Sequence, residues 1–268
     1  MKTYTRVLTI AGSDSGGGAG IQADLKTVSA LGCYGLSVIT ALTAQNTLGV
    51  SGIHSVPPAF VAEQLKSVLS DIGVNAVKIG MLHAPDIIRV IADTLTGFGV
   101  RTIVVDPVMV ATSGDKLLQD EAIDALKTHL LPLATVITPN LPEAGVLLNR
   151  PLNTFTDLQQ AAADLGRQYP GAILVKGGHL HDAESTDLLY ISPDEQILFP
   201  TKRIDTPNSH GTGCTLSSAI AAGLAKGFSL REAVNQAKTY LTGALQAGAA
   251  YQLGHGHGPV HHFFSIWQ

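Results

Sequence analysis

The sequence predicts a three-layer α/β/α fold, in which helices cover both faces of a mostly parallel central sheet. Short runs of β-branched and aliphatic residues alternate with segments that have apolar residues at three- to four-residue spacing, as in strands joined by crossover helices. The 268 residues are 45% hydrophobic and only 14% charged, with 28 glycines. This composition is typical of a sheet that is buried on both faces.

The strands are expected where short apolar runs are bounded by polar or glycine-rich residues. Their predicted ranges are 7–11, 36–42, 76–80, 102–105, 136–138, 173–176 and 188–191. A β-like stretch that follows, up to residue 199, could pair antiparallel at an edge of the sheet.

Helices are expected between these strands and after the last of them, with Pro85 suited to a first helical turn. Their predicted ranges are 23–31, 58–71, 85–95, 121–131, 157–169, 215–226 and 230–248. No linker or internal repeat interrupts the pattern. Residues 1–268 are therefore expected to form a single domain.

The charge and the cysteine content exclude several classes of partner. The formal net charge is −4 without a basic cluster, so the sequence lacks the electrostatic feature that binds nucleic acid or an anionic membrane. No apolar run is long enough for a signal peptide or a membrane span. Two cysteines do not make a disulfide framework. We therefore expect a cytoplasmic protein that acts on a small molecule.

A glycine-rich turn from His210 to Thr215 is the most informative segment, because a helix is predicted directly after it. Gly211, Thr212 and Gly213 would present backbone amides at a helix start, where the amides and the helix dipole bind anions. Phosphoryl transfer is the chemistry that most needs such a site. The alternative is that the two glycines only form a tight turn.

Two common nucleotide-binding motifs are excluded. Residues 18–23 match the dinucleotide pattern G-x-G-x-x-A, but residues 38–45 contain no carboxylate that could bind a ribose. The Walker A pattern G-x-x-x-x-G-K-[ST] is absent. A kinase with this sequence must therefore belong to another class.

Polar residues follow several predicted strands, at the edge where open parallel sheets bind ligands. Asp106 ends a buried strand, where a carboxylate requires a cationic partner such as Mg²⁺. Asn140 and Glu143 could hold the same hydrated cation, although this pair is also typical of a helix capping box. Lys176 precedes two glycines, as expected for a lysine that points at phosphate; the alternative is an ordinary strand-end lysine.

Cys214 lies inside the glycine-rich turn, at the expected helix start. A helix N-terminus can lower the pKa of a thiol well below its usual value of about 8.5, which makes Cys214 a candidate general base. The alternative is a small side chain packed against the sheet.

The C-terminal tail contains four of the ten histidines, separated by glycines at positions 254, 256 and 258. They are His255, His257, His261 and His262. Their His-x-His spacing could ligate a transition metal, but no cysteine or carboxylate accompanies them to complete a site. The favoured interpretation is a shaped loop without a metal.

Taken together, these residues resemble the ribokinase-like superfamily, and within it the hydroxymethylpyrimidine and phosphomethylpyrimidine kinases of thiamine biosynthesis. The resemblance runs from residues 8–24, LTIAGSDSGGGAGIQAD, to the Gly-His-Gly-Pro tail and covers nearly the whole chain. Superfamily members generally have Gly-x-Gly-Asp in the turn, with the aspartate as base. Cys214 stands at that position here, a variant shared with some pyridoxal kinases.

The resemblance implies an ATP- and Mg²⁺-dependent kinase that acts as a homodimer on an aminopyrimidine alcohol and its phosphate. It implies that Gly12, Asp24, Gln45, Met81 and Val108 surround the aminopyrimidine, and that Asp106, Asn140, Glu143 and Lys176 serve Mg-ATP, with Asp106 and Glu143 at the metal. Gln45 has independent support, because its amide offers the acceptor and donor that match a 4-aminopyrimidine.

Two alternatives remain open. Pyridoxine also carries a hydroxymethyl group on a six-membered nitrogen ring, so the pocket could belong to a pyridoxine or pyridoxal kinase. A pyrimidine-binding protein without turnover is disfavoured, because a binder would not need Lys176, Asp106, Glu143 and the glycine turn together.

The implied reaction phosphorylates first the alcohol and then the resulting monophosphate. The alcohol must lose a proton as it attacks, whereas a phosphate monoester is already anionic near neutral pH. A base role for Cys214 therefore predicts that Cys214→Ala impairs the first step more than the second. Equal loss would indicate that Cys214 positions the acceptor. A bulky residue at Gly213 is expected to impair both steps.

Overall fold

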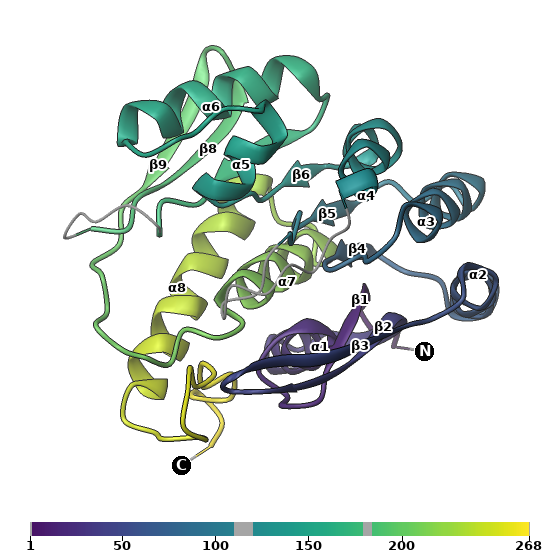
Figure 1. Cartoon of the computed structure of the whole chain (residues 1–268), viewed down its shortest axis with the longest axis horizontal. Helices are drawn as coiled ribbons and strands as arrows, with labels where there is room; N and C mark the ends of the chain where they lie inside the picture. Colours follow the sequence, from purple (N-terminus) through teal and green to yellow (C-terminus); the bar gives the residue numbers. More distant parts are fainter. Residues whose placement is uncertain (1, 110–119, 179–183, 268) are drawn as a thin grey trace.

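The protein is described by a computed structural model that covers residues 2–109, 120–178 and 184–267 (Figure 1). Within these residues the chain forms a nine-stranded sheet with the order β3-β2-β1-β4-β5-β6-β7-β8-β9. Neighbouring strands are parallel from β2 to β7, whereas β3, β8 and β9 pair antiparallel at the two edges. The prediction of a mostly parallel sheet is confirmed, as is the antiparallel edge strand near residue 199.

Each predicted strand is present, and β1, β2 and β8 are longer than predicted. The strands are β1 (Arg6–Asp14), β2 (Tyr34–Asn46), β3 (Gly49–Ser55), β4 (Ala76–Ile79), β5 (Ile103–Val105), β6 (Val136–Ile137), β7 (Ala172–Val175), β8 (Asp187–Ser192) and β9 (Glu195–Phe199). Strand β3, which forms a hairpin with β2, was not predicted from the sequence. Its two glycines and few apolar residues hide the strand pattern.

Each predicted helix is also present, with ends that differ by a few residues. The helices are α1 (Gly20–Ala30), α2 (Pro58–Ser67), α3 (Pro85–Gly97), α4 (Asp120–Ala125), α5 (Leu141–Leu148), α6 (Phe155–Gln168), α7 (Thr212–Ala225) and α8 (Leu230–Gly248). Five-residue π-helical segments, Val68–Ile72 and Leu126–Leu130, extend α2 and α4. Helix α5 was not predicted, because it has only eight residues and these are mostly apolar.

The two faces of the sheet carry separate hydrophobic cores. Helices α2 to α6 pack on one face, where alternate strand residues such as Leu8, Val105 and Ile173 point. Helices α1, α7 and α8 pack on the other face, against the intervening residues such as Val104 and Leu174. The three-layer arrangement follows from this alternation, because successive side chains of a strand point to opposite faces.

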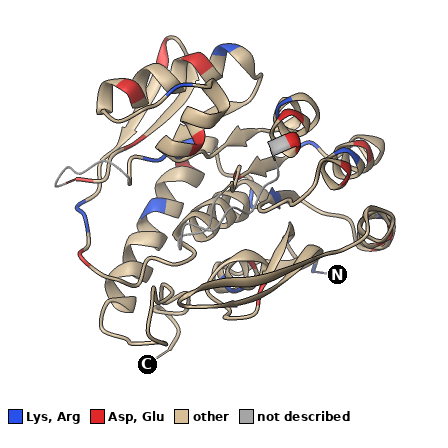
Figure 2. Cartoon of the chain, viewed as in Figure 1, with Lys and Arg blue, Asp and Glu red and all other residues tan. Residues whose placement is uncertain are grey.

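Helix α7 is central, since it packs against β1, β4, β5, α1 and α8. Figure 2 marks charged residues along the outer helices, whereas the sequence of α7 contains none. Its first turn lies at the carboxyl ends of the parallel strands, beside Asp106 after β5 and Lys176 after β7. In the described residues no helix is both long and apolar enough to cross a bilayer.

Candidate active site

A cavity of about 800 Å³ lies in front of the first turn of α7. Of the predicted site residues, all but one line this cavity: Gly12, Gln45, Met81, Asp106, Val108, Asn140, Glu143, Lys176, Gly211, Thr212, Gly213 and Cys214. They come from the ends of β1, β2, β4, β5, β6 and β7, and from α7. The topology therefore brings residues that are far apart in the sequence to one edge of the sheet.

Gly211 shapes the N-terminus of α7, with a φ of 80°. A Cβ atom at Gly211 would lie 1.9 Å from the carbonyl oxygen of Gly18, so only glycine fits this turn. Within the described chain no side chain caps α7. The backbone amide of Thr212 donates to the Ser209 carbonyl oxygen at 3.4 Å, which leaves the backbone amides of Gly213 and Cys214 to face an anion in the cavity.

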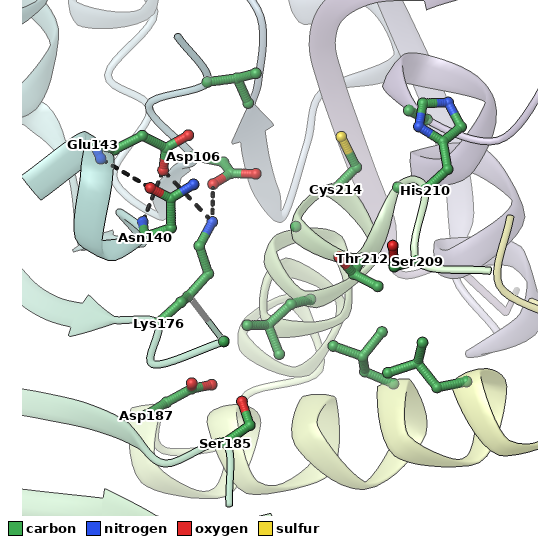
Figure 3. Close-up of a pocket in the computed structure, with 18 of the residues that line it drawn as sticks. Asp106, Asn140, Glu143, Lys176, Ser185, Asp187, Ser209, His210, Thr212 and Cys214 are labelled. Carbon is green, nitrogen blue, oxygen red and sulfur yellow. Dashed lines mark hydrogen bonds and ion pairs between the residues drawn. The ribbon is translucent and has the colours of Figure 1, made fainter. Parts of the chain in front are cut away.

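Four polar side chains converge on one side of the cavity, opposite the start of α7 (Figure 3). The Nζ atom of Lys176 lies 2.8 Å from Oδ1 of Asp106 and 3.8 Å from Oε2 of Glu143. The Asn140 side chain accepts a hydrogen bond from the backbone amide of Glu143, and the Glu143 carboxylate accepts one from the backbone amide of Asn140. The capping-box alternative is thus confirmed, and the pair that caps α5 also faces the cavity.

The charges of this cluster do not balance, because two carboxylates share one lysine. Burial acts to raise the pKa of Asp106, but Lys176 and Lys78 together hold that pKa below its usual value. Burial raises the pKa of Glu143 to about 7. Lys176 acts to lower this pKa, whereas the negative charge of Asp106 acts to raise it. An additional cation beside the two carboxylates would stabilise both in the ionised form.

Asp24 is the predicted site residue that does not line the cavity. It was predicted to surround the substrate, but the fold places it outside the cavity lining. Its side chain is fully buried in an ion pair with Lys78, with Nζ–O distances of 2.8 and 2.9 Å. Thr9 and Ser218 donate further hydrogen bonds to the same carboxylate. Asp24 therefore lies beneath the site, and Ser218 links it to α7 one turn after Cys214.

His210 and Asp14 are among the further polar residues that line the cavity but were not predicted from the sequence. Nε2 of His210 lies 2.9 Å from Oδ2 of Asp14 and 3.4 Å from the side-chain nitrogen Nε2 of Gln45. Asp14 also accepts hydrogen bonds from the backbone amides of Gly16, Gly18 and Ala19. A signal existed in the sequence, because His210 directly precedes Gly211 and Asp14 lies in the polar, glycine-rich stretch that begins after the apolar run 7–11.

The expected lowering of the Cys214 pKa is wrong for this site. The side chain is half-buried, and loss of solvation raises the pKa of the thiol to about 11, although Lys78 acts in the opposite direction. Asp24 and Asp106 raise the pKa further. Cys214 is therefore a neutral thiol near pH 7, and the helix terminus does not outweigh its surroundings.

This pKa predicts how Cys214 reacts with an alkylating agent. In a Cys33→Ser background, the rate of iodoacetamide labelling is expected to rise about tenfold per pH unit up to pH 10, because only the thiolate reacts. Peptide mass mapping would follow the modification at Cys214. A labelling rate that levels off below pH 8 would contradict the raised pKa and would support the lowered pKa that the sequence predicted.

Comparison with known proteins identifies relatives over nearly the full length. The chain matches the family described as phosphomethylpyrimidine kinase over residues 14–261. It is 55% identical to the hydroxymethylpyrimidine/phosphomethylpyrimidine kinase of Rhizobium meliloti strain 1021, over 97% of this chain and 98% of that protein.

Two solved structures show the same fold. A phosphomethylpyrimidine kinase from Clostridium difficile 630 has a TM-score of 0.79 and 44% identity, covering 90% of this chain and 99% of its own. The ADP complex of a Bacillus subtilis pyridoxal kinase has a TM-score of 0.89 and 37% identity, covering 97% and 98%.

The fold and the site together define a small-molecule kinase of the ribokinase-like class, as the sequence resemblance implied. The family match over residues 14–261 and the 55% identity to the Rhizobium meliloti protein then show which family the chain belongs to. The chain belongs to the phosphomethylpyrimidine kinase family.

Proposed function

We propose that this single-domain protein uses Mg-ATP to phosphorylate 4-amino-5-hydroxymethyl-2-methylpyrimidine to its monophosphate, and then the monophosphate to the diphosphate. The observation that carries the proposal is one cavity in which the open amides of α7 face Lys176 and Asp106, with Gln45 also on the lining. Membership of the phosphomethylpyrimidine kinase family supports the choice of acceptor.

Asp106, Glu143, Asn140 and Lys176 form the proposed nucleotide end of the site. The oxygen donors suit a hard cation that stays partly hydrated, and the unbalanced charge of the cluster favours one. Asp106 and Glu143 would hold Mg²⁺, which would neutralise negative charge on the phosphates of ATP. Lys176 would then exchange part of its contact with Asp106 for a phosphate oxygen.

The transferred phosphoryl group would lie against the first turn of α7. The backbone amides of Gly213 and Cys214 and the positive end of the helix dipole would stabilise charge on its equatorial oxygens. Because the same phosphoryl oxygens develop charge in both steps, one anion site serves both acceptors.

The aminopyrimidine would bind at the opposite end, beside Gln45. The Gln45 amide pairs with the ring nitrogen and the 4-amino group, while Met81 and Val108 provide apolar walls and Gly12 allows close approach. Asp24 would act from below, by holding Lys78 under the site.

Because the Cys214 thiol is neutral near pH 7, we propose that Cys214 positions the acceptor and does not act as a general base. Cys214→Ala is therefore expected to slow both phosphorylation steps by a similar factor of about tenfold, as for a lost positioning contact. Steady-state rates with hydroxymethylpyrimidine and with its monophosphate provide the comparison. A loss confined to the alcohol step would instead assign the proton transfer to Cys214.

A homodimer and a cytoplasmic location complete the proposal. The edge strand β3 and the exposed side chains of Leu48 and Phe60, which are 66% and 55% exposed, offer apolar surface for a second copy. Light scattering during size-exclusion chromatography tests the dimer, and a monomer at micromolar concentration would refute it. The cytoplasm supplies ATP and keeps Cys33 and Cys214 as the free thiols that the structure contains.

An ADP-release assay tests the function directly. Purified protein with Mg-ATP is expected to release ADP with saturation by hydroxymethylpyrimidine and by its monophosphate, each well above the rate without acceptor. Pyridoxine is the matched alternative acceptor. Turnover with pyridoxine alone would assign the chain to vitamin B6 salvage, and no acceptor-dependent release would leave a pyrimidine-binding protein.

A further inference from the structure

The glycine- and histidine-rich C-terminal tail lies against the turn of the β2–β3 hairpin and the loop that precedes α7 (Figure 1). We call residues 254–262 the C-terminal clamp. In this segment of the described chain no group of three histidine, cysteine or acidic side chains is arranged around a metal. Its backbone contacts give it another role.

One residue of the hairpin turn, Thr47, holds the clamp through three hydrogen bonds. The Oγ1 atom of Thr47 accepts from the amides of His255 and Gly256, both at 3.2 Å. The carbonyl oxygen of Thr47 accepts from the amide of His257 at 2.9 Å. Thr47 is two residues from Gln45, so the clamp restrains the strand end that carries Gln45.

The spacing of the glycines follows from this contact. A Cβ atom at Gly256 would lie 2.1 Å from the Thr47 carbonyl oxygen, and one at Gly254 would lie 2.3 Å from Thr47 Oγ1. A Cβ atom at Gly258 would lie 2.0 Å from Oδ1 of Asn208. Each glycine therefore allows a close backbone approach that a side chain would prevent.

The clamp binds the loop before α7 as well as the hairpin. The His210 amide donates to the Gly258 carbonyl oxygen at 3.0 Å, and His210 forms a parallel bridge with Pro259. Beyond it, Nε2 of His262 lies 3.1 Å from Oγ1 of Thr215, in the first turn of α7. One short segment thus contacts both sides of the acceptor end of the cavity.

We propose that the C-terminal clamp is a positioning element for the acceptor, which sets Gln45 against His210 by tying Thr47 to the loop that carries His210. The two side chains are 3.4 Å apart in the cavity lining, although they come from residues 165 positions apart in the sequence. The assignment of the acceptor end rests on the proposed function. The contacts of the clamp do not depend on it.

Thr47→Val is the test variant, because it removes the Oγ1 acceptor and keeps the shape of the side chain. Thr47→Ser keeps the oxygen and is the rescue variant. Thr239→Val is the control, because it removes an exposed hydroxyl that donates within α8 to the Asn235 carbonyl oxygen.

Hydrogen exchange measured by mass spectrometry is the first readout. Thr47→Val is expected to accelerate exchange in peptides that cover residues 44–49 and 254–258, while peptides from α3 exchange as in the wild type. Unchanged exchange at both segments would overturn the clamp. This readout requires no substrate, so it decides the inference even if the proposed function fails.

The kinetic readout separates positioning from general damage. Thr47→Val is expected to raise the KM for hydroxymethylpyrimidine about tenfold, as for two lost hydrogen bonds, with the KM for ATP unchanged and Thr47→Ser and Thr239→Val close to the wild type. An equal rise in the KM for ATP, or a Thr47→Ser protein as impaired as Thr47→Val, would refute acceptor positioning. A wild-type protein without pyrimidine turnover would refute only the proposed function.

Discussion

Replacing Gly213 with valine is expected to lower the rate of both phosphoryl transfers by about 10²- to 10³-fold, the usual effect of losing one donor to a developing oxyanion. A Cβ atom at Gly213 would lie 3.4 Å from both Oδ2 of Asp106 and Nζ of Lys176. Alanine therefore fits at ordinary contact distance, whereas the branches of valine extend into the space between the α7 amides and Lys176.

A graded pair of variants makes this prediction specific. Gly213→Ala is expected to retain most activity, and Gly213→Val to lose nearly all of it with both pyrimidine acceptors. Gly97→Val is the matched control, because a Cβ atom there meets nothing within 4 Å. Intact turnover of Gly213→Val would show that the first turn of α7 does not bind the transferred phosphoryl group.

Asp106→Asn is expected to lower kcat about 10²-fold and to raise the Mg²⁺ concentration for half-maximal activity, because a metal-binding carboxylate loses its charge. The substitution keeps the size of the side chain and an oxygen for the hydrogen bond from Thr138. A magnesium titration at saturating ATP measures both effects.

The control for this variant is Asp93→Asn, an exposed position on α3 with the same change of charge. It is expected to behave as the wild type. If Asp106→Asn has the wild-type magnesium dependence and a normal kcat, the nucleotide end of the site is wrongly assigned.

Most of the fold could be predicted from the sequence, because buried parallel strands and amphipathic helices leave strong periodic patterns. The hairpin strand β3 was missed because its glycines interrupt that pattern. The short helix α5 was missed although Asn140 and Glu143 were recognised as a possible capping box, because its eight mostly apolar residues show no helical periodicity. Here the two interpretations are compatible, because one pair performs the capping and faces the cavity.

The contents of the site were less accessible to sequence reasoning. Residues after strand ends were found because a parallel sheet gathers them at one edge, as Asp106 and Lys176 show. Asp24 was placed beside the substrate only by the family resemblance, and in the structure it lies in α1 and pairs with the buried Lys78. The Cys214 pKa depends on burial and on charges from distant segments, which no local pattern reports.

The pairing of His210 with Asp14 and Gln45 also required the structure. These residues come from three segments that meet only in the folded chain. The same holds for the clamp, whose glycines and histidines suggested a metal site or a shaped loop until their contacts with Thr47 were known.

The central claim is that one site phosphorylates the alcohol and then its monophosphate, and a product time course measures this most directly. Purified protein is incubated with Mg-ATP and hydroxymethylpyrimidine alone, and the products are followed by mass spectrometry. The account predicts that the monophosphate appears first and is then converted to the diphosphate, and that Gly213→Val abolishes both products together. Monophosphate that accumulates without diphosphate, or loss of only one product in Gly213→Val, would contradict a single two-step site.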